Sequence, residues 1–304
     1  MRFVSTAFFL ATAVSCVSAI GDLGFSLGVK RNSDGGCKTT EDYLADFNTI
    51  GAYSNIVRVY AASDCNTLQY ILPAVKQAGV QLVVGVWPTD DTHFSEEKQA
   101  LTTYLPGYAS NVYAVTVGSE ALYRGDLTAE QLASDIDEIR TLVQGIDGYG
   151  STPVGTADSW NVLVNAGNYA AIQASDVVLA NAFSYWQGQT MANSSHSFVD
   201  DIMQALQIIQ TVKGSTDISF WVGETGWPTD GGNYGASVPS VANAAQFWQE
   251  SICGIRAWGI NTFVFEAFDE SWKPVTSGVS GVETHWGVWT DSNQSPKYSI
   301  DCDF

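Results

Sequence analysis

Two glutamates are candidates for catalysis, because each lies at the end of a strand-like segment. In both, a β-branched residue and a glycine come shortly before the glutamate. Glu120 ends the segment Val-Gly-Ser-Glu at 117–120, and Glu224 ends Val-Gly-Glu at 222–224. Cleavage of a glycosidic bond needs one carboxylic acid to protonate the leaving oxygen and a second carboxylate to attack or to activate water. The alternative is two structural ion pairs, but only 13 basic residues face 32 acidic ones in this chain.

The segments that must position these glutamates alternate between short apolar runs and longer amphipathic stretches, as parallel strands joined by helices do. Eight segments have strand-like composition: 23–29, 56–60, 80–87, 112–117, 153–157, 177–182, 218–223 and 262–265. Seven have the apolar spacing of helices: 40–50, 65–78, 95–104, 128–143, 162–173, 198–212 and 241–258. Thr128 and Gln131 form a capping-box start for the fourth helix.

This alternation predicts an α/β fold, a single (β/α)8 TIM barrel over residues 20–304, with the active-site cleft at the C-terminal ends of the strands. An open doubly wound sheet is the alternative, but the Gly-x-Gly-x-x-Gly motif of nucleotide sites does not follow the first strand. The barrel places Glu120 and Glu224 at the ends of the fourth and seventh strands, on the same face.

Other polar and aromatic side chains near the strand ends are candidates for binding a sugar. Aromatic rings stack on sugar faces, while amides and charged groups hydrogen-bond to hydroxyls. The candidates are Arg58, Tyr60, Trp87, Ser119, Asn181, Tyr185, Trp227, Glu266, Asp269, Glu270 and Lys273. Tyr185 and Trp227 are favoured as stacking platforms because they flank polar strand-end residues.

The N-terminus has the pattern of a secretory signal peptide. Arg2 precedes an apolar run at 8–14 and the small residues Val-Ser-Ala at 17–19. We therefore expect a signal peptide at 1–19 and a mature chain that is secreted, extracellular or in a cell wall. The apolar run is shorter than the roughly 20 residues of a membrane span. The last residues, Asp-Cys-Asp-Phe at 301–304, lack a lipid-anchor signal, so no membrane anchor is expected.

Four cysteines remain once Cys16 leaves with the signal peptide, and an even number in an exported chain favours disulfides. They are Cys37, Cys65, Cys253 and Cys302. Of the three possible connectivities we favour Cys37 with Cys65 and Cys253 with Cys302, because these pairs join neighbouring segments.

Composition narrows the partners further. A net charge of −19 makes nucleic acid an unfavourable partner, because an anionic protein repels its phosphates. The same charge does not affect the binding of a neutral polysaccharide. No metal or other cofactor is expected, because the chain has no Cys-x-x-Cys and its histidines, His93, His196 and His285, are scattered. Asn193 begins a glycosylation motif in a polar loop before the sixth helix. We expect a monomer.

Several motifs resemble those of glycoside hydrolase family 17. The segment Val-Gly-Glu-Thr-Gly-Trp-Pro at 222–228 resembles its nucleophile signature, and Val-Gly-Ser-Glu-Ala-Leu at 117–122 lies where that family has its acid/base. The segment 265–273 resembles its eighth-strand motif, with His-Trp-Gly-Val-Trp following at 285–289, and 57–60 resembles its second strand. The resemblance covers almost the whole mature chain and favours the fungal secreted cell-wall branch of β-1,3-glucanases and glucanosyltransferases over the plant branch.

The resemblance implies that Glu120 is the acid/base and Glu224 the nucleophile, with Glu266 and Lys273 as hydrogen-bonded neighbours. It implies retaining cleavage of β-1,3-glucan, with water or another glucan chain as the acceptor. Related barrel hydrolases usually have Asn before the acid/base to hold the sugar 2-hydroxyl. Here that residue is Ser119, so either its hydroxyl works through a water or another group does the task.

Two other functions stay open at this point. One is a wall-binding barrel without turnover, which is disfavoured because both carboxylates are present. The other is a retaining glycosidase that acts on another polysaccharide, such as mannan or β-1,4-glucan.

Overall fold

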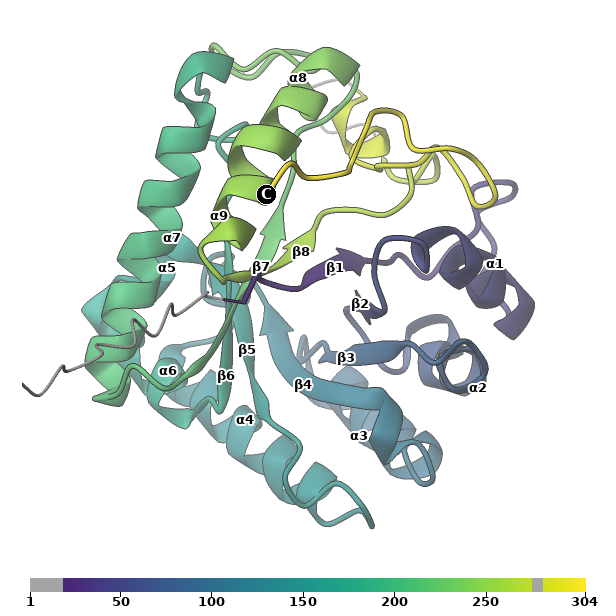
Figure 1. Ribbon diagram of the computed structural model, residues 1–304. Helices are drawn as coiled ribbons and strands as arrows, with labels where there is room; N and C mark the ends of the chain where they lie inside the picture. Colours follow the sequence, from purple (N-terminus) through teal and green to yellow (C-terminus); the bar gives the residue numbers. More distant parts are fainter. Residues whose placement is uncertain (1–18, 275–280) are drawn as a thin grey trace, which may run out of the picture.

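The computed structural model describes residues 19–274 and 281–304 (Figure 1). The predicted signal peptide, Ala19 excepted, lies outside the described residues, and so does Cys16. In the ranges that are described, no helix is long and apolar enough to cross a membrane.

Eight parallel strands form a closed barrel, in which β1 pairs with both β2 and β8. They are β1 (Leu23–Ser26), β2 (Ile56–Arg58), β3 (Gln81–Val86), β4 (Val112–Ser119), β5 (Val154–Ser159), β6 (Val177–Asn181), β7 (Ser219–Thr225) and β8 (Asn261–Val264). Most strand residues are buried, because one face of each strand lines the barrel interior and the other meets the helices (Figure 1). The predicted (β/α)8 barrel is confirmed, and each predicted strand overlaps an observed one.

The helices surround the barrel (Figure 1). They are α1 (Thr40–Ile50), α2 (Thr67–Ala78), α3 (Asp91–Tyr104), α4 (Ala129–Gln144), α5 (Trp160–Leu163), α6 (Tyr169–Ala174), α7 (Met191–Lys213), α8 (Val241–Phe247) and α9 (Gly254–Ala257). A π-helical stretch, Trp248–Cys253, joins α8 to α9, and 3-10 turns lie at Asp64–Asn66, Ala109–Asn111, Ala166–Asn168 and Val282–Thr284. The predicted capping box of Thr128 and Gln131 is present at the start of α4.

Three predicted helices were placed wrongly. The single helix predicted at 162–173 is split into α5 and α6, because the side chain of Asn165 accepts the Gly167 N–H and begins a separate turn. Helix α3 begins earlier than predicted because Asp90 caps it.

Helix α7 also begins earlier than predicted, so Asn193 lies in its first turn and not in a loop before it. The polar residues that open α7 show no apolar spacing, which hid this turn from a pattern-based prediction. Asn193 is exposed, and its amide donates a hydrogen bond to Gln189 at 2.7 Å.

A small apolar cluster made only of strand residues fills the barrel interior. Its largest members are Trp221 of β7 and Phe263 of β8, whose rings stack with centroids 4.8 Å apart. Trp221 precedes Glu224 along β7, so this cluster lies beneath the strand ends that carry the candidate site. The packed rings support those strand ends from inside the barrel.

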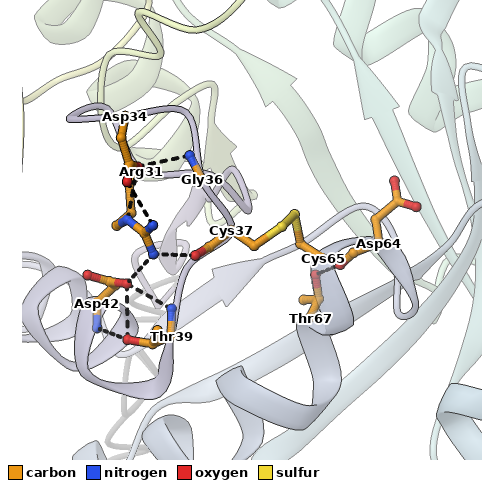
Figure 2. Close-up of a disulfide and its surroundings, with 9 residues drawn as sticks. All are labelled: Arg31, Asp34, Gly36, Cys37, Thr39, Asp42, Asp64, Cys65 and Thr67. Carbon is orange, nitrogen blue, oxygen red and sulfur yellow. Dashed lines mark hydrogen bonds and ion pairs between the residues drawn. A yellow bond between two sulfur atoms is a disulfide. The ribbon is translucent and has the colours of Figure 1, made fainter.

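Both disulfides have the predicted pairing. Cys37–Cys65 joins the β1–α1 loop to the turn before α2 (Figure 2), and Cys253–Cys302 joins the π-helical stretch to the C-terminal segment. The cysteines are 28 and 49 residues apart in sequence. On the chain-entropy account, each cross-link restricts the unfolded chain enough to contribute about 4 kcal/mol.

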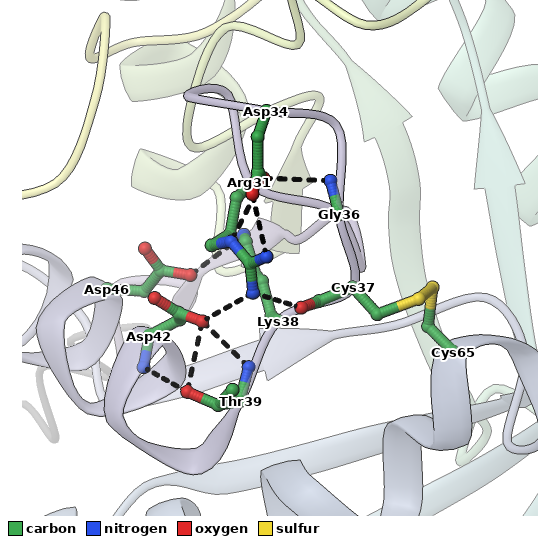
Figure 3. A network of polar contacts seen from close by, with 9 residues as sticks. All are labelled: Arg31, Asp34, Gly36, Cys37, Lys38, Thr39, Asp42, Asp46 and Cys65. Carbon is green, nitrogen blue, oxygen red and sulfur yellow. Dashed lines mark hydrogen bonds and ion pairs between the residues drawn. A yellow bond between two sulfur atoms is a disulfide. The ribbon is translucent and has the colours of Figure 1, made fainter.

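The β1–α1 loop is held by a polar network around Arg31 (Figure 3). The guanidinium donates to the backbone carbonyl of Cys37 and contacts Asp42, which also belongs to the capping box of α1. Nearby, Lys38 forms a buried ion pair of 2.9 Å with Asp46. Together with the disulfide, these contacts fix the loop on the C-terminal side of β1.

Candidate active site

Glu224, near the end of β7, is paired with a buried cation. Nη1 of Arg58 donates to Oε1 of Glu224 at 3.0 Å and to the Gly223 carbonyl at 2.9 Å. Nη2 of Arg58 donates to the Ser119 hydroxyl at 3.1 Å, which in turn donates to Oε1 of Glu224 at 3.3 Å. Arg58 is 1 % exposed. This guanidinium balances the charge of Glu224 and fixes its orientation.

Glu120, directly after β4, has a different environment. Its backbone is left-handed, with φ of 57°, and it follows Gly118 at φ of 74°. Such a conformation costs a non-glycine residue about 1–2 kcal/mol. The amide of Asn181 donates to Oε1 of Glu120 at 3.1 Å. Burial and the charge of Glu224 raise the pKa of Glu120 to about 7, so its carboxyl group keeps its proton in weak acid.

Asp158 of β5 holds the turn that follows Glu120. Its carboxylate accepts the backbone N–H groups of Leu122 at 2.8 Å and Tyr123 at 3.2 Å. Burial raises the pKa of Asp158 to about 6. The contacts support the left-handed turn, so this strand-end carboxylate is structural.

Glu120 and Glu224 line the same cleft, which has a volume of about 450 Å³. Six aromatic residues share its lining: Tyr123, Trp160, Phe183, Trp186, Phe265 and Trp286. Its polar lining residues are Ser159, Asn161, Gln187 and Glu283. Carboxylates among aromatic rings and hydrogen-bonding groups are suited to hold sugar rings beside an acid and a nucleophile.

Tyr185 and Trp227, the favoured stacking platforms, are instead buried at 0 % and 2 % exposure. Their rings meet edge to face at 5.5 Å, and the indole N–H of Trp227 donates to the Val238 carbonyl. Tyr185 also packs edge to face on Trp186 and Trp286, which line the cleft. The two residues therefore support the cleft wall from behind.

Tyr60 and Trp87 each have one ring face near an arginine. The guanidinium of Arg58 lies 4.8 Å from the centroid of Tyr60, and that of Arg124 lies 4.7 Å from the centroid of Trp87. Burial and the charge of Glu224 hold the pKa of Tyr60 well above its usual value. Its hydroxyl is buried and has no hydrogen-bond partner among the described residues.

Glu266, Glu270 and Lys273 form a charged cluster after β8. Nζ of Lys273 lies 3.0 Å from Glu266 and 2.6 Å from Glu270. Burial and the charge of Glu270 raise the pKa of Glu266. Burial would lower the pKa of Lys273, but the two carboxylates outweigh it and raise that pKa. Lys273 also lies 4.6 Å from the ring centroid of Phe265, so the cluster borders the cleft wall.

The structure places Asp269 and Glu270 away from the cleft lining. Both line a neighbouring cavity of about 240 Å³. Asp269 pairs with Lys297 at 2.6 Å and accepts the Gly287 N–H at 3.0 Å, and these bonds hold it there. Position at a strand end did not by itself bring a carboxylate into the cleft.

None of the six aromatic residues that line the cleft was among the candidates predicted from the sequence. Trp160 follows β5 directly, and Trp186 is the neighbour of the chosen Tyr185. The signal was present as aromatic residues in the segments that follow β5 and β6. Which of two adjacent rings faces the cleft depends on loop conformation, which the sequence pattern does not give.

Comparison with known proteins finds relatives among the glycoside hydrolases. Residues 24–287 match the BtgE/BtgC glycoside hydrolase domain. A glucan 1,3-beta-glucosidase of Saccharomyces cerevisiae is 61 % identical over the full length of both chains. The glycoside hydrolase family 17 β-1,3-glucanosyltransferase of Rhizomucor miehei is 30 % identical, with a TM-score of 0.79 over 92 % of this chain and 97 % of that one. An active-site mutant of the R. miehei enzyme, in complex with laminaritriose, gives a TM-score of 0.78 at 31 % identity over 92 % and 98 % of the two chains.

Fold and site together define a barrel glycoside hydrolase with two carboxylates in one cleft. The chain belongs to the BtgE/BtgC glycoside hydrolase family, and the resemblance to glycoside hydrolase family 17 that its motifs predicted is confirmed.

Proposed function

We propose that this chain is a secreted, retaining enzyme that cleaves β-1,3-glucan and passes the bound fragment to water or to another glucan. The observation that carries this proposal is the contrast between the two carboxyl groups of the cleft. Glu224 has Arg58 as its cation, and Glu120 has a pKa raised to about 7 by burial and by Glu224. One is suited to act as a nucleophile and the other as an acid.

In the first step, the carboxylate of Glu224 attacks the anomeric carbon while Glu120 donates its proton to the glycosidic oxygen. The bond to the leaving glucan breaks, that glucan departs as an alcohol, and the remaining sugar is held as an ester of Glu224. In the second step, Glu120, now a carboxylate, takes a proton from the acceptor hydroxyl. The acceptor oxygen attacks the anomeric carbon, and Glu224 leaves as a carboxylate.

The aromatic lining supports transfer as well as hydrolysis. Trp160 and Trp186 line the same cleft as Glu120, where a second glucan chain could stack and compete with water. The relatives carry both activities in their names, a glucosidase in S. cerevisiae and a glucanosyltransferase in R. miehei. The R. miehei mutant was solved with laminaritriose bound, which favours a β-1,3-linked glucose chain as the ligand.

Two features support export. The described residues contain two disulfides, which persist in oxidising compartments and are rare in the cytosol. The first 19 residues have the composition of a signal peptide. N-terminal sequencing of the protein from culture medium and cell-wall extract would test both the cleavage site and the location.

The experiment that tests the proposed reaction is incubation with a linear β-1,3-glucan oligosaccharide, followed by mass analysis and by NMR of the first products formed. We expect shorter products in the β-anomeric form, together with products longer than the starting chain at high substrate concentration. Intact substrate would indicate a non-catalytic binder. Cleavage of mannan or β-1,4-glucan in preference would assign another polysaccharide, and α-anomeric first products would rule out retention.

A further inference from the structure

A third carboxylate lines the cleft that holds the two catalytic candidates. Glu283 lines it together with Glu120 and Glu224. It lies in the 3-10 turn Val282–Thr284 and is half-buried. Trp286, from the same segment, also lines the cleft. The proposed two-step reaction uses only two carboxylates, so it gives Glu283 no role.

Contacts from the segment between β7 and α8 fix the backbone of this turn. The N–H and the hydroxyl of Thr229 both donate to the carbonyl of His285, at 2.9 and 3.0 Å. The N–H of His285 donates to the carbonyl of Val282 at 3.0 Å. A side chain at Gly231 would meet the backbone of Val282 at 2.8 Å, so the two segments pack directly on each other. Glu283 therefore projects from a backbone that another segment holds in place.

The charge of Glu283 is not balanced by an ion pair in the described part of the chain. Lys273, whose charge acts on Glu283, is paired instead with Glu266 and Glu270. The residues at 275–280 include no lysine, arginine or histidine. Burial raises the pKa of Glu283, and the charge of Lys273 opposes that rise. A partly buried carboxylate without a protein partner is costly unless water or a ligand satisfies its oxygens.

Two buried carboxylates that follow β8 show the contrast. Asp269 pairs with Lys297 and Glu270 pairs with Lys273, both at 2.6 Å. Such contacts hold a carboxylate in the protein and occupy its oxygens. Glu283 has no such contact among the described residues and lies in the cleft, which is the position of a group that meets a substrate.

We propose that Glu283 is a substrate-binding residue, whose carboxylate accepts hydrogen bonds from hydroxyl groups of the glucan and disfavours sugars that carry a negative charge. This inference rests on the proposed function and adds a residue that selects the substrate class. An ionised carboxylate only accepts hydrogen bonds, and its two oxygens accept several. Bonds from hydroxyls to a carboxylate are about twice as strong as those between neutral groups. Each glucose unit inside a β-1,3-linked chain keeps hydroxyls at C2, C4 and C6 that can donate.

Selection against charge follows from the same group. Two negative charges a few ångströms apart repel each other strongly where burial limits solvent screening. An acidic sugar beside Glu283 meets this repulsion, whereas a neutral glucan does not. A preference for neutral over acidic chains that depends on the charge of Glu283 is therefore expected.

Glu283 was not among the candidates predicted from the sequence. Strand β8 ends at Val264, and strand periodicity gives no position for a turn so far beyond it. The packing of the β7–α8 segment on this turn holds Glu283 at the cleft.

The first test measures binding in a chain that cannot turn over. Glu224→Gln removes the nucleophile and keeps an oxygen that accepts from Arg58, so it serves as the parent chain. We expect isothermal titration with a β-1,3-linked glucose hexasaccharide at pH 7.5 to give a Kd about tenfold higher when Glu283→Gln is added, because the amide oxygen accepts without a charge. Adding Glu283→Ala should raise Kd about thirtyfold, because no acceptor remains. Thermal melting of each chain shows whether it is folded.

Glu250→Gln is the matched control, because Glu250 is exposed and lies outside the cleft lining, and its loss changes the net charge equally. It should leave Kd unchanged. The same hexasaccharide oxidised to carboxylates at C6 measures charge selection. The parent chain should bind the oxidised form about tenfold more weakly than the neutral form. Glu283→Gln should reduce that ratio about threefold, and Glu250→Gln should not.

The second test uses the active chain. Glu283→Gln should raise KM for the hexasaccharide about tenfold and leave kcat and the alkaline limb of its pH profile in place, because the contact is made both before and during reaction. A lower kcat or a moved alkaline limb, with KM unchanged, would show that Glu283 acts through Lys273 and the catalytic groups. That result would overturn the assignment of Glu283 to substrate binding.

Failure of this inference is distinguishable from failure of the proposed function. If the parent chain binds no glucan, the proposed function is wrong, and this inference with it. If the parent chain binds glucan and both Glu283 variants bind it equally well, only this inference is wrong.

Discussion

The ends of β4 and β7 carry the same side chain in opposite environments. Glu224 lies within β7 and receives a buried guanidinium from Arg58. Glu120 lies after a left-handed turn and receives a neutral amide from Asn181. A cation favours the carboxylate form, whereas burial favours the neutral acid. The comparison teaches that neighbours, and not residue type, divide the two roles between two glutamates.

The two environments also depend on each other. The charge of Glu224 is one cause of the raised pKa of Glu120. Formation of a glycosyl ester removes that charge, so the pKa of Glu120 falls when the group must change from acid to base. The arrangement therefore suits both steps of a retaining reaction.

The prediction with the largest expected effect concerns Glu224 on β7. Glu224→Ala should lower kcat on a β-1,3-glucan oligosaccharide by about 10⁴-fold or more, because no side chain remains to form the ester. Oligosaccharide binding should persist, but the thermal midpoint should fall, because Arg58 is left buried without its carboxylate. Near-normal turnover would remove Glu224 from the role of nucleophile.

The next prediction concerns Glu120, which follows β4 and supplies the proton. Glu120→Gln should lower kcat on natural glucan by about 10³-fold, because an amide cannot protonate the leaving oxygen. An aryl glycoside with a good leaving group needs little protonation, so the first step with that substrate should be partly restored. Restoration in Glu224→Ala and not in Glu120→Gln would reverse the two assignments.

The strand ends were predictable from sequence because each parallel strand is a short run of buried apolar residues, and both glutamates follow such runs. The pairing of Arg58 with Glu224 was not predictable in detail. It joins β2 to β7 across the barrel mouth, and a linear pattern contains no information about which cation faces which carboxylate. Only the closed barrel brings the two together.

Loop conformation limited the rest of the site. Tyr185 and Trp186 are adjacent and both aromatic, yet one is core and the other lines the cleft. Asp269 and Glu270 follow β8, but they pair with Lys297 and Lys273 and line another cavity. Strand periodicity stops at the strand end, so it cannot orient residues beyond it.

A third test removes the cation that separates the two environments. Arg58→Met should lower kcat by about 10²-fold, and it leaves a buried carboxylate without its partner, which costs about 3 kcal/mol or more of folding stability. Arg58→Lys is the matched control, since it restores the charge but not the fork that contacts Glu224, Gly223 and Ser119 together. The activity of Arg58→Lys should lie between that of the natural chain and that of Arg58→Met. Equal activity in all three chains would show that the cation does not act on Glu224.

A fourth test concerns pH. Glu120 is active as an acid while protonated, so kcat/KM should be sustained below its pKa of about 7 and fall about tenfold per pH unit above it. The hydrogen bond from Asn181 lowers that pKa because it favours the charged form. Asn181→Ala should therefore move the alkaline limb to higher pH. A limb that stays in place would show that another group controls the decline.

The smallest expected effect concerns the acceptor. Trp186→Ala should reduce the ratio of transfer to hydrolysis about fivefold, because losing one stacking ring weakens acceptor binding by about 1 kcal/mol while water is unaffected. The matched control is Trp258→Ala, since Trp258 is 63 % exposed and is not part of the cleft lining. Mass analysis of products longer than the substrate measures the ratio. If both variants keep the natural ratio, stacking on Trp186 does not select the acceptor, and another part of the cleft determines the choice between water and sugar.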